Sequence, residues 1–240
     1  RLVYAPRGES SGHLTFRFRY LIETQGRPMA GALCALLGVA RVTERFDGAD
    51  LAKILKDSRK SQNDVSTELA GQVLEALWEL VRGFQAANDA SQRQLLEQVL
   101  RESKHDVYGG LLSTLMRLVF VLYAEDRGLM PPSTVYQRHY SVLGLFERLR
   151  DDEARYPDTM DARYGAWAHL LALFRLIHDG GGHGDLRSAA RHGRLFNPDA
   201  YPFLEGRPPG AARQLGEVLE APRVPDGTVF RVLRNLLILD

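Results

Sequence analysis

Two short segments of the sequence combine side chains that could perform acid–base or metal chemistry. Residues 117–130, RLVFVLYAEDRGLM, run from apolar side chains into the adjacent acids Glu125 and Asp126. Residues 178–185, HDGGGHGD, place two histidines and two aspartates close together. Paired carboxylates are typical of general acid–base sites, and histidine with aspartate is typical of metal sites. Each segment also has a purely structural interpretation.

The two adjacent acids fit the polar end of a helix better than a catalytic pair. Neighbouring side chains on a helix point about 100° apart, so Glu125 and Asp126 cannot converge on one substrate. Gly128 is placed to take the left-handed conformation that ends a helix, with Leu129 folding back on the preceding turn. Arg127 suits the negative end of the helix dipole, whereas both acids should seek basic partners. We therefore predict a helix stop with an inter-helix salt bridge.

The histidine-containing segment is predicted to be a loop that closes a helix. Its glycines impose no rigid ligand spacing, and the dipole at a helix C-terminus disfavours phosphate. A cofactor loop for S-adenosylmethionine should follow a strand, whereas helical sequence precedes this one. A metal-dependent hydrolase built on His178, His183 and nearby acids stays open as an alternative.

Other motifs lack the context that their chemistry requires. The segment FNPDAYPF, residues 196–203, lacks the second proline of the Asn-Pro-Pro-Tyr turn of amino-methyltransferases, so we interpret it as a turn with packed aromatic side chains. The E-x-K pattern at residues 102–104 matches half of a nuclease motif but falls at a helix end instead of on a strand. We therefore predict no catalytic, metal or cofactor-binding residue in this sequence.

The best candidates for DNA contacts precede the clearest amphipathic helix. Residues 56–66, KDSRKSQNDVS, mix basic and amide side chains, which bind phosphate, near a helix N-terminus. A solvated helix entry is the other interpretation of this segment. The candidate residues are Lys56, Arg59, Lys60, Gln62 and Asn63.

The composition is ordinary for a soluble globular protein. The chain is 45% hydrophobic and 25% charged, and its net charge of +1 gives no overall basic footprint for nucleic acid. The lone Cys34 lies among apolar neighbours and is predicted to be a small buried residue in a reducing compartment. No apolar run approaches the roughly 18 residues of a membrane span. We expect a cytoplasmic protein without membrane contact.

Helical periodicity dominates the middle of the chain. Alternating side chains at 14–21, with residues 1–4, predict a hairpin, and a proline-led helix follows from Pro28 to Gly38. Further helices are expected at about 49–57, 64–88, 91–101, 106–127, 141–150, 162–179 and 211–219, and from Asp226, which can cap the last one. The stretch from Leu118 to Tyr123 is nearly apolar all round and predicts a central, buried helix.

These elements predict a mainly α fold: a multi-helix bundle with a small N-terminal β element and a loop-rich C-terminal part. Residues 1–48 would end an N-terminal region made of a β-hairpin and a short helix. Residues 49–180 would form the helical bundle, and 181–240 a loop-rich connector. Both ends of the chain are apolar, so we expect a piece of a larger protein in which the connector leads to a further domain.

Five segments, taken in order, resemble the helical region of large N6-adenine DNA methyltransferases from restriction and phage-defence systems. They are SRKSQNDVSTELAGQVLEALWELVRGFQAAN, LLSTLMRLVFVLYAEDRGLMP, HYSVLGLFERLR, RYPDTMDARYGAWAHLLALFRLIHDGGGHGDL and RLFNPDAYPFLEG. The similarity is to type IIG-like enzymes and to methylases of the BREX and DISARM kinds, and it covers about residues 50–240. Its structural signature is Glu125, Asp126, Arg127 and Gly128.

The resemblance implies a parent enzyme that uses S-adenosylmethionine to methylate adenine N6 in duplex DNA, flipping the base out to reach it. In that family the catalytic domain, with its cofactor loop, follows the segment similar to our C-terminus. This chain alone is therefore expected to be inactive and to bind no cofactor. It would pack on the methyltransferase domain, help to seat DNA and contact other defence-system subunits. The alternative is an α-helical protein-interaction scaffold without a nucleic-acid role.

Overall fold

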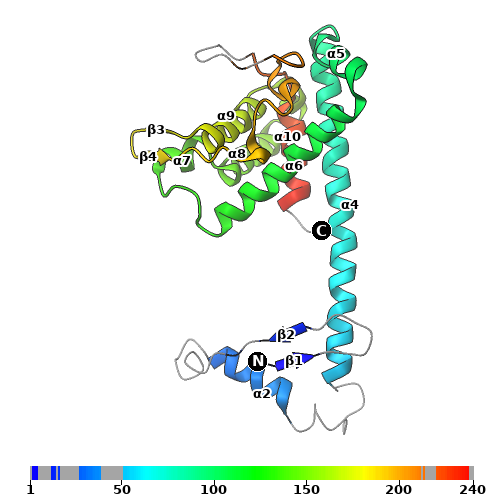
Figure 1. Cartoon of the computed structure of the whole chain (residues 1–240), viewed down its shortest axis with the longest axis vertical. Helices are drawn as coiled ribbons and strands as arrows, with labels where there is room; N and C mark the ends of the chain where they lie inside the picture. The colour runs from blue at the N-terminus through cyan, green and yellow to red at the C-terminus, as the bar shows by residue number, and fades with distance from the viewer. Residues whose placement is uncertain are drawn as a thin grey trace. The chain divides into compact units, whose positions relative to one another are not determined.

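The computed structural model describes residues 2–4, 12–14, 16, 27–38, 51–211, 213 and 220–237, with many side chains between 51 and 67 left out. Contacts divide the chain into two compact units, Arg1–Thr67 and Glu68–Asp240. The fold is mainly α, as predicted, and the described residues also form two antiparallel sheets of two strands each (Figure 1). The predicted boundaries at residues 48 and 180 stay predictions.

The first unit contains the predicted hairpin and helix. Strand β1 (Leu2–Tyr4) pairs antiparallel with β2 (Gly12–Leu14), and helix α2 spans Arg27–Leu37. The expected strand residues beyond Leu14 lie, except for Phe16, outside the described residues. Cys34 is exposed, so the prediction of a buried thiol is wrong. None of the described residues of α2 is buried. Its apolar side chains therefore follow helical periodicity but do not form a core.

Helix α4 is one continuous element, Leu51–Ala90, where the sequence predicted two. The polar residues 58–63 contain neither proline nor glycine, so nothing in the backbone chemistry ends the helix there. The five candidate DNA-contact residues therefore lie within the helix, and the argument from a helix N-terminus does not apply to them. Lys60 is exposed. The side chains of the other four lie outside the described part of the structure.

The second unit packs the remaining helices around one apolar core. Its elements are α5 (Gln94–Glu102), α6 (Lys104–Asp126), α7 (Thr134–His139), α8 (Val142–Arg155), η2 (Pro157–Ala162), α9 (Ala166–Asp179), β3 (Gly181–His183), β4 (Leu186–Ser188), η3 (Arg194–Phe196), η4 (Pro202–Glu205) and α10 (Asp226–Leu237). The sequence did not predict α7 or the β3–β4 hairpin. The helix expected at 211–219 falls largely outside the described residues.

Aromatic side chains from three separate elements meet at the centre of this core. Phe84 of α4 stands edge-on to Trp167 of α9 at 5.0 Å between ring centroids and to Phe203 of η4 at 5.7 Å. The buried Trp167 satisfies its indole N–H by donating to the Leu204 carbonyl at 3.0 Å. These contacts pack the loop-rich C-terminal part against the helical bundle.

Asp226 begins α10 as predicted, but its side chain caps a different helix. Its Oδ1 accepts the backbone N–H of Ala166, the first residue of α9, at 2.8 Å. The Asp226 backbone N–H in turn donates to the Arg163 carbonyl at 2.9 Å. The two contacts hold the starts of α9 and α10 together, because the first amides of a helix have no partner inside it.

Helix α6 is exposed along one side, contrary to the prediction of a central helix buried all round. It buries eight of its 23 residues, and among its apolar residues Met116, Val119 and Phe120 are exposed. Among the described helices, α6 is the one long and apolar enough to cross a membrane by length and composition. Core helices of soluble proteins pass the same test, and α6 packs against α5, α8 and η3.

Candidate functional site

The AEDRG segment forms the predicted helix stop. Gly128 has a φ of 62°, and its N–H donates to the Glu125 carbonyl at 3.0 Å. The Leu129 N–H reaches back to the Ala124 carbonyl at 2.9 Å, which completes the Schellman hydrogen-bond pair. Leu129 itself is 63% exposed, so the expected packing of its side chain on the preceding turn is wrong.

Glu125 caps a neighbouring helix instead of forming a salt bridge. Its Oε1 accepts the Tyr136 hydroxyl at 2.7 Å and the Val142 N–H at 2.8 Å. Its Oε2 accepts the Leu143 N–H at 3.0 Å and the Ser141 hydroxyl at 3.3 Å. Val142 begins α8, so the carboxylate satisfies amides that have no partner inside that helix. The predicted inter-helix salt bridge is therefore wrong for Glu125, whose partners are all amides and hydroxyls.

Asp126 lies on the other side of the helix end. Its ion pair is with the next residue, Arg127, at 3.6 Å, and both side chains are exposed. Arg127 also lies over the Tyr123 ring, 5.3 Å from its centroid. Because Glu125 is engaged by four donors and Asp126 faces solvent, the two acids perform separate structural tasks. A catalytic carboxylate pair is not formed here.

The segment 196–203 is a turn with packed aromatic side chains, as predicted. Asn197 Oδ1 accepts the Asp199 N–H at 2.9 Å, the hydrogen bond of an Asx turn. Phe196 and Phe203 are both buried. The ring of Phe203 lies so close to α6 that a Cβ on Gly110 would meet its Cζ at 2.6 Å. The turn therefore fixes the C-terminal segment on α6.

A buried arginine on α6 anchors the same turn. Arg117 donates from Nε to the Leu195 carbonyl at 2.6 Å and from Nη2 to the Asn197 carbonyl at 3.2 Å. Its guanidinium lies over the Phe174 ring, 5.3 Å from the centroid. Burial lowers the pKa of Arg117 to about 10, so the side chain stays charged at neutral pH. No sequence pattern predicts this role of Arg117, which stands inside an apolar run.

A second buried network joins α9 to η4. The buried Glu205 accepts two hydrogen bonds from Arg175, at 2.7 and 2.8 Å, and one from Arg207 at 3.1 Å. Arg207 is also buried and pairs with Asp199 at 2.8 Å. The hydrogen bonds to Glu205 raise the pKa of Arg175. All these charges are used inside the fold, which favours a structural role over a binding site.

The histidine-containing segment forms the β3–β4 hairpin instead of an irregular loop. Asp185 at its tip caps α7: Oδ2 accepts the Thr134 N–H at 2.7 Å and its hydroxyl at 3.0 Å. Oδ1 accepts the Ser133 hydroxyl at 2.9 Å. His183 is exposed and belongs to no cluster of metal-ligand types among the described residues. His178 meets His192 and not His183, so the pairing considered for a hydrolase does not form.

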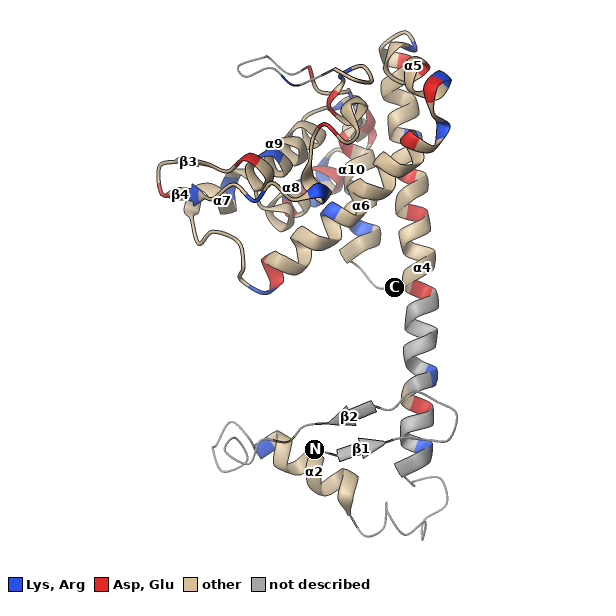
Figure 2. Cartoon of the chain, viewed as in Figure 1, with Lys and Arg blue, Asp and Glu red and all other residues tan. Residues whose placement is uncertain are grey.

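The outer side of α6 carries a run of exposed apolar residues. We name it the α6 apolar face. It comprises Tyr108, Leu112, Met116, Val119, Phe120 and Tyr123. These residues recur at steps of three and four, which places them on one side of the helix. Charged residues gather at the two ends of α6 (Figure 2). The one charged residue between them, Arg117, is buried. The face therefore offers a continuous apolar stripe.

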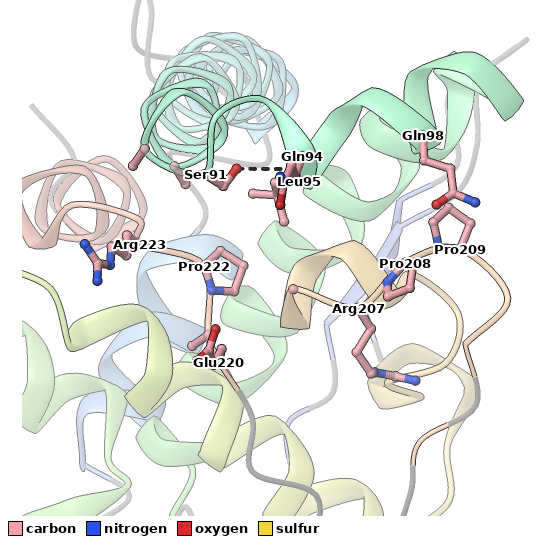
Figure 3. A pocket seen from close by; sticks show the side chains of 14 residues that line it. Ser91, Gln94, Leu95, Gln98, Arg207, Pro208, Pro209, Glu220, Pro222 and Arg223 are labelled. Carbon is pink, nitrogen blue, oxygen red and sulfur yellow. Dashed lines mark hydrogen bonds between the residues drawn. The ribbon is translucent and has the colours of Figure 1, made fainter.

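A cleft of about 750 Å³ lies where the end of α4 and the start of α5 approach the C-terminal segment (Figure 3). Ser91 and Leu95 stand on one wall, and three prolines, at 208, 209 and 222, line the other. Arg207 and Arg223 direct their guanidinium groups away from the space between the walls (Figure 3). Glu220 is the one acid on its lining, and the described residues around the cleft form no cluster of metal-ligand types.

Comparison of the chain with protein-family models, curated proteins and solved structures finds no match. A functional proposal therefore rests on the residues of this chain and on the five sequence segments quoted at the start.

Proposed function

We propose that this chain is the helical, non-catalytic part of a site-specific DNA adenine-N6 methyltransferase from a bacterial restriction or phage-defence system. Its role is to pack on the catalytic domain through the α6 apolar face. The parent enzyme takes its methyl group from S-adenosylmethionine and acts in the cytoplasm on duplex DNA. The five segments that, in the same order along the chain, resemble such enzymes support this proposal.

The α6 apolar face is the observation that carries the packing role. Tyr108 and Tyr123, at its two ends, are each 57% exposed, and Met116 between them is 55% exposed. Contiguous apolar patches of this kind on a protein surface mark interaction sites, because leaving them in water is unfavourable. Large aromatic and methionine side chains are also the types enriched in the centres of protein interfaces. A partner domain with a complementary apolar surface fits this face.

The other polar contacts support a structural role for this chain instead of a catalytic one. The carboxylates that first suggested chemistry, Glu125 and Asp185, cap helices α8 and α7. Glu205 is enclosed by two arginines. Their hydrogen bonds hold the surface elements rigidly in place, as a connector that positions a catalytic domain requires. DNA contacts by the candidate residues of α4 remain part of the proposal.

The first test is methylation by the complete reading frame. Expression in a host without adenine methylation should produce N6-methyladenine within one sequence motif, detected by single-molecule sequencing of genomic DNA. The reading frame should encode a glycine-rich cofactor loop and an Asn-Pro-Pro-Tyr turn. Replacing the asparagine of that turn should abolish the signal. A frame without these motifs, or without methylation, would refute the proposal.

The second test separates the α6 apolar face from general stability. Met116→Asp places a charge in the proposed interface and should reduce methylation at least tenfold while the chain alone keeps its melting temperature, because Met116 is 55% exposed. Leu100→Asp is a matched control, because Leu100 is exposed to a similar degree on α5, outside the face. Equal losses in both variants, or none in Met116→Asp, would remove the packing role.

The scaffold alternative predicts a different response to DNA. A domain that helps to seat duplex DNA should bind it at low salt, with an affinity that falls steeply as salt releases counterions. Lys60→Glu, on the exposed side of α4, should weaken this binding. No binding at low salt would favour a protein-interaction module without a nucleic-acid role.

A further inference from the structure

The end of α9 and the chain that leaves the β3–β4 hairpin bring two histidines and one aspartate together. The free carbonyl of His178, in the last turn of α9, accepts the N–H groups of Arg191 at 3.2 Å and His192 at 3.1 Å. These bonds satisfy a helix-terminal carbonyl and set the His192 ring against the His178 ring, with centroids 5.3 Å apart and planes at 83°. Asp179 Oδ1 lies 2.8 Å from His178 Nδ1.

The three side chains converge on one point in space. One ligand atom from each of His178, Asp179 and His192 lies within 4.8 Å of the other two. Zinc holds imidazole nitrogen and carboxylate oxygen at about 2.0–2.2 Å, so two ligands of one ion lie up to about 4 Å apart. His192 is exposed, so its ring is free to rotate towards that spacing. His178 is 15% exposed and is held at the helix end.

We propose that His178, Asp179 and His192 form a binding site for a zinc-class divalent metal ion. The bound ion links the end of α9 to the segment after β4. Two imidazoles and one carboxylate suit zinc and its neighbours among the transition metals. Water would complete the coordination. The ion takes the place of the hydrogen bond between His178 and Asp179, and a neutral His178 that binds through Nδ1 keeps its proton on Nε2. The site is separate from the α6 apolar face and does not depend on the proposed function.

The surroundings of the site contain both negative and positive charge. The dipole of α9 places partial negative charge at this helix end, which favours a cation. Arg213 opposes it, because it binds both oxygens of Asp179, with Nη2 2.9 Å from Oδ1. This ion pair holds the pKa of Asp179 well below its usual range, so the carboxylate is ionised and available as a ligand. Arg213 thus keeps the carboxylate charged but competes with the metal for it.

Calorimetric titration of the chain with zinc chloride tests the site. The expected result is saturable binding at one equivalent. His192→Ala should weaken this binding at least tenfold, and because His192 is exposed the variant should fold normally. Arg213→Ala should bind zinc at least as tightly as the unmodified chain, since the competing cation is gone.

His183→Ala is the matched control, because His183 lies in the hairpin between Asp179 and His192 but outside the cluster. It should bind zinc like the unmodified chain. Absence of saturable binding, an unchanged affinity in His192→Ala, or an equal loss in His183→Ala would each overturn the proposal. A loss of affinity in Arg213→Ala would overturn the direct role of Asp179.

Discussion

The two sides of helix α6 carry similar residue types and meet opposite environments. The inward side consists mainly of aliphatic residues that are almost completely buried: Leu111, Leu115, Leu118 and Val121. The outward side is at least as apolar yet faces solvent: Leu112, Met116, Val119, Phe120 and Tyr123. Hydrophobicity alone therefore does not reveal which side the fold uses. The difference indicates that one side stabilises this chain, whereas the other is available to a partner.

The largest expected effect comes from truncating each side in turn. Leu118→Ala leaves a cavity in a closed core and should cost about 2–5 kcal/mol of the free energy of unfolding. Met116→Ala on the outer side should change it by only about 0.5 kcal/mol. Urea denaturation of the chain measures both. Equal costs would show that the outer side is buried in solution, for example by self-association.

The two acids at the end of α6 extend the comparison to charged residues. Glu125→Ala removes the acceptor for two amides and two hydroxyls and should cost about 1–3 kcal/mol. Asp126→Ala, next in sequence but exposed, should be nearly neutral, because exposed ion pairs contribute little. A thermal unfolding series with both variants decides this. A larger cost for Asp126→Ala would contradict the capping role of Glu125.

The glycine pair near the start of α6 tests the closeness of packing on its inner side. Gly110→Ala would press a methyl group on the buried Phe203 ring, and overpacking of about 1–3 kcal/mol should outweigh the gain in helix propensity of about 1 kcal/mol. At Gly109 the nearest atom is the Tyr201 hydroxyl, 2.8 Å away at the far end of a half-buried side chain that can shift. Gly109→Ala should therefore be neutral or mildly stabilising. Chemical denaturation of the two variants should rank them in this order.

The smallest effect concerns the second capping carboxylate, Asp185, and depends on pH. The Thr134 and Ser133 donors lower its pKa to about 2 from an ordinary 3.8, so the capping contributes stability above pH 3.8 and loses it as the pH falls towards about 2. The melting temperature of Asp185→Asn should fall below that of the unmodified chain at neutral pH, and the two should converge in acid. A difference that grows in acid would contradict this assignment.

Local signals along the chain predicted most elements but not their partners. The Schellman turn at Gly128 follows from a glycine after a helical run, and the structure confirms it. The predicted break near residue 60 is wrong, because a cluster of polar side chains without proline or glycine does not end a helix. Helix α7 is too short, at six residues, to show helical periodicity, although Ser133 caps it locally; its other cap, Asp185, lies about fifty positions away.

Candidate sites were harder to predict than elements, since each depends on contacts between distant segments. Glu125 was correctly assigned a structural role, but its partners are backbone amides and hydroxyls on the next helices, which no local pattern indicates. In the sequence His178 lies near His183, whereas the fold places it against His192. The β3–β4 hairpin, which no sequence motif predicts, brings the chain back to the end of α9. Arg117 gave no signal, because its carbonyl partners lie 78 and 80 residues away.

The sequence by itself determined that the chain is mainly helical, where α6 ends, and that the acids in AEDRG cannot act as a pair. These properties follow from periodicity, glycine geometry and the 100° turn of an α-helix, which are local. Only the tertiary structure decided which side of α6 is buried, which carboxylate caps which helix and which histidines meet. Such contacts arise when distant segments pack together, because unpaired helix ends and apolar surface gain free energy only from the neighbours that the fold supplies.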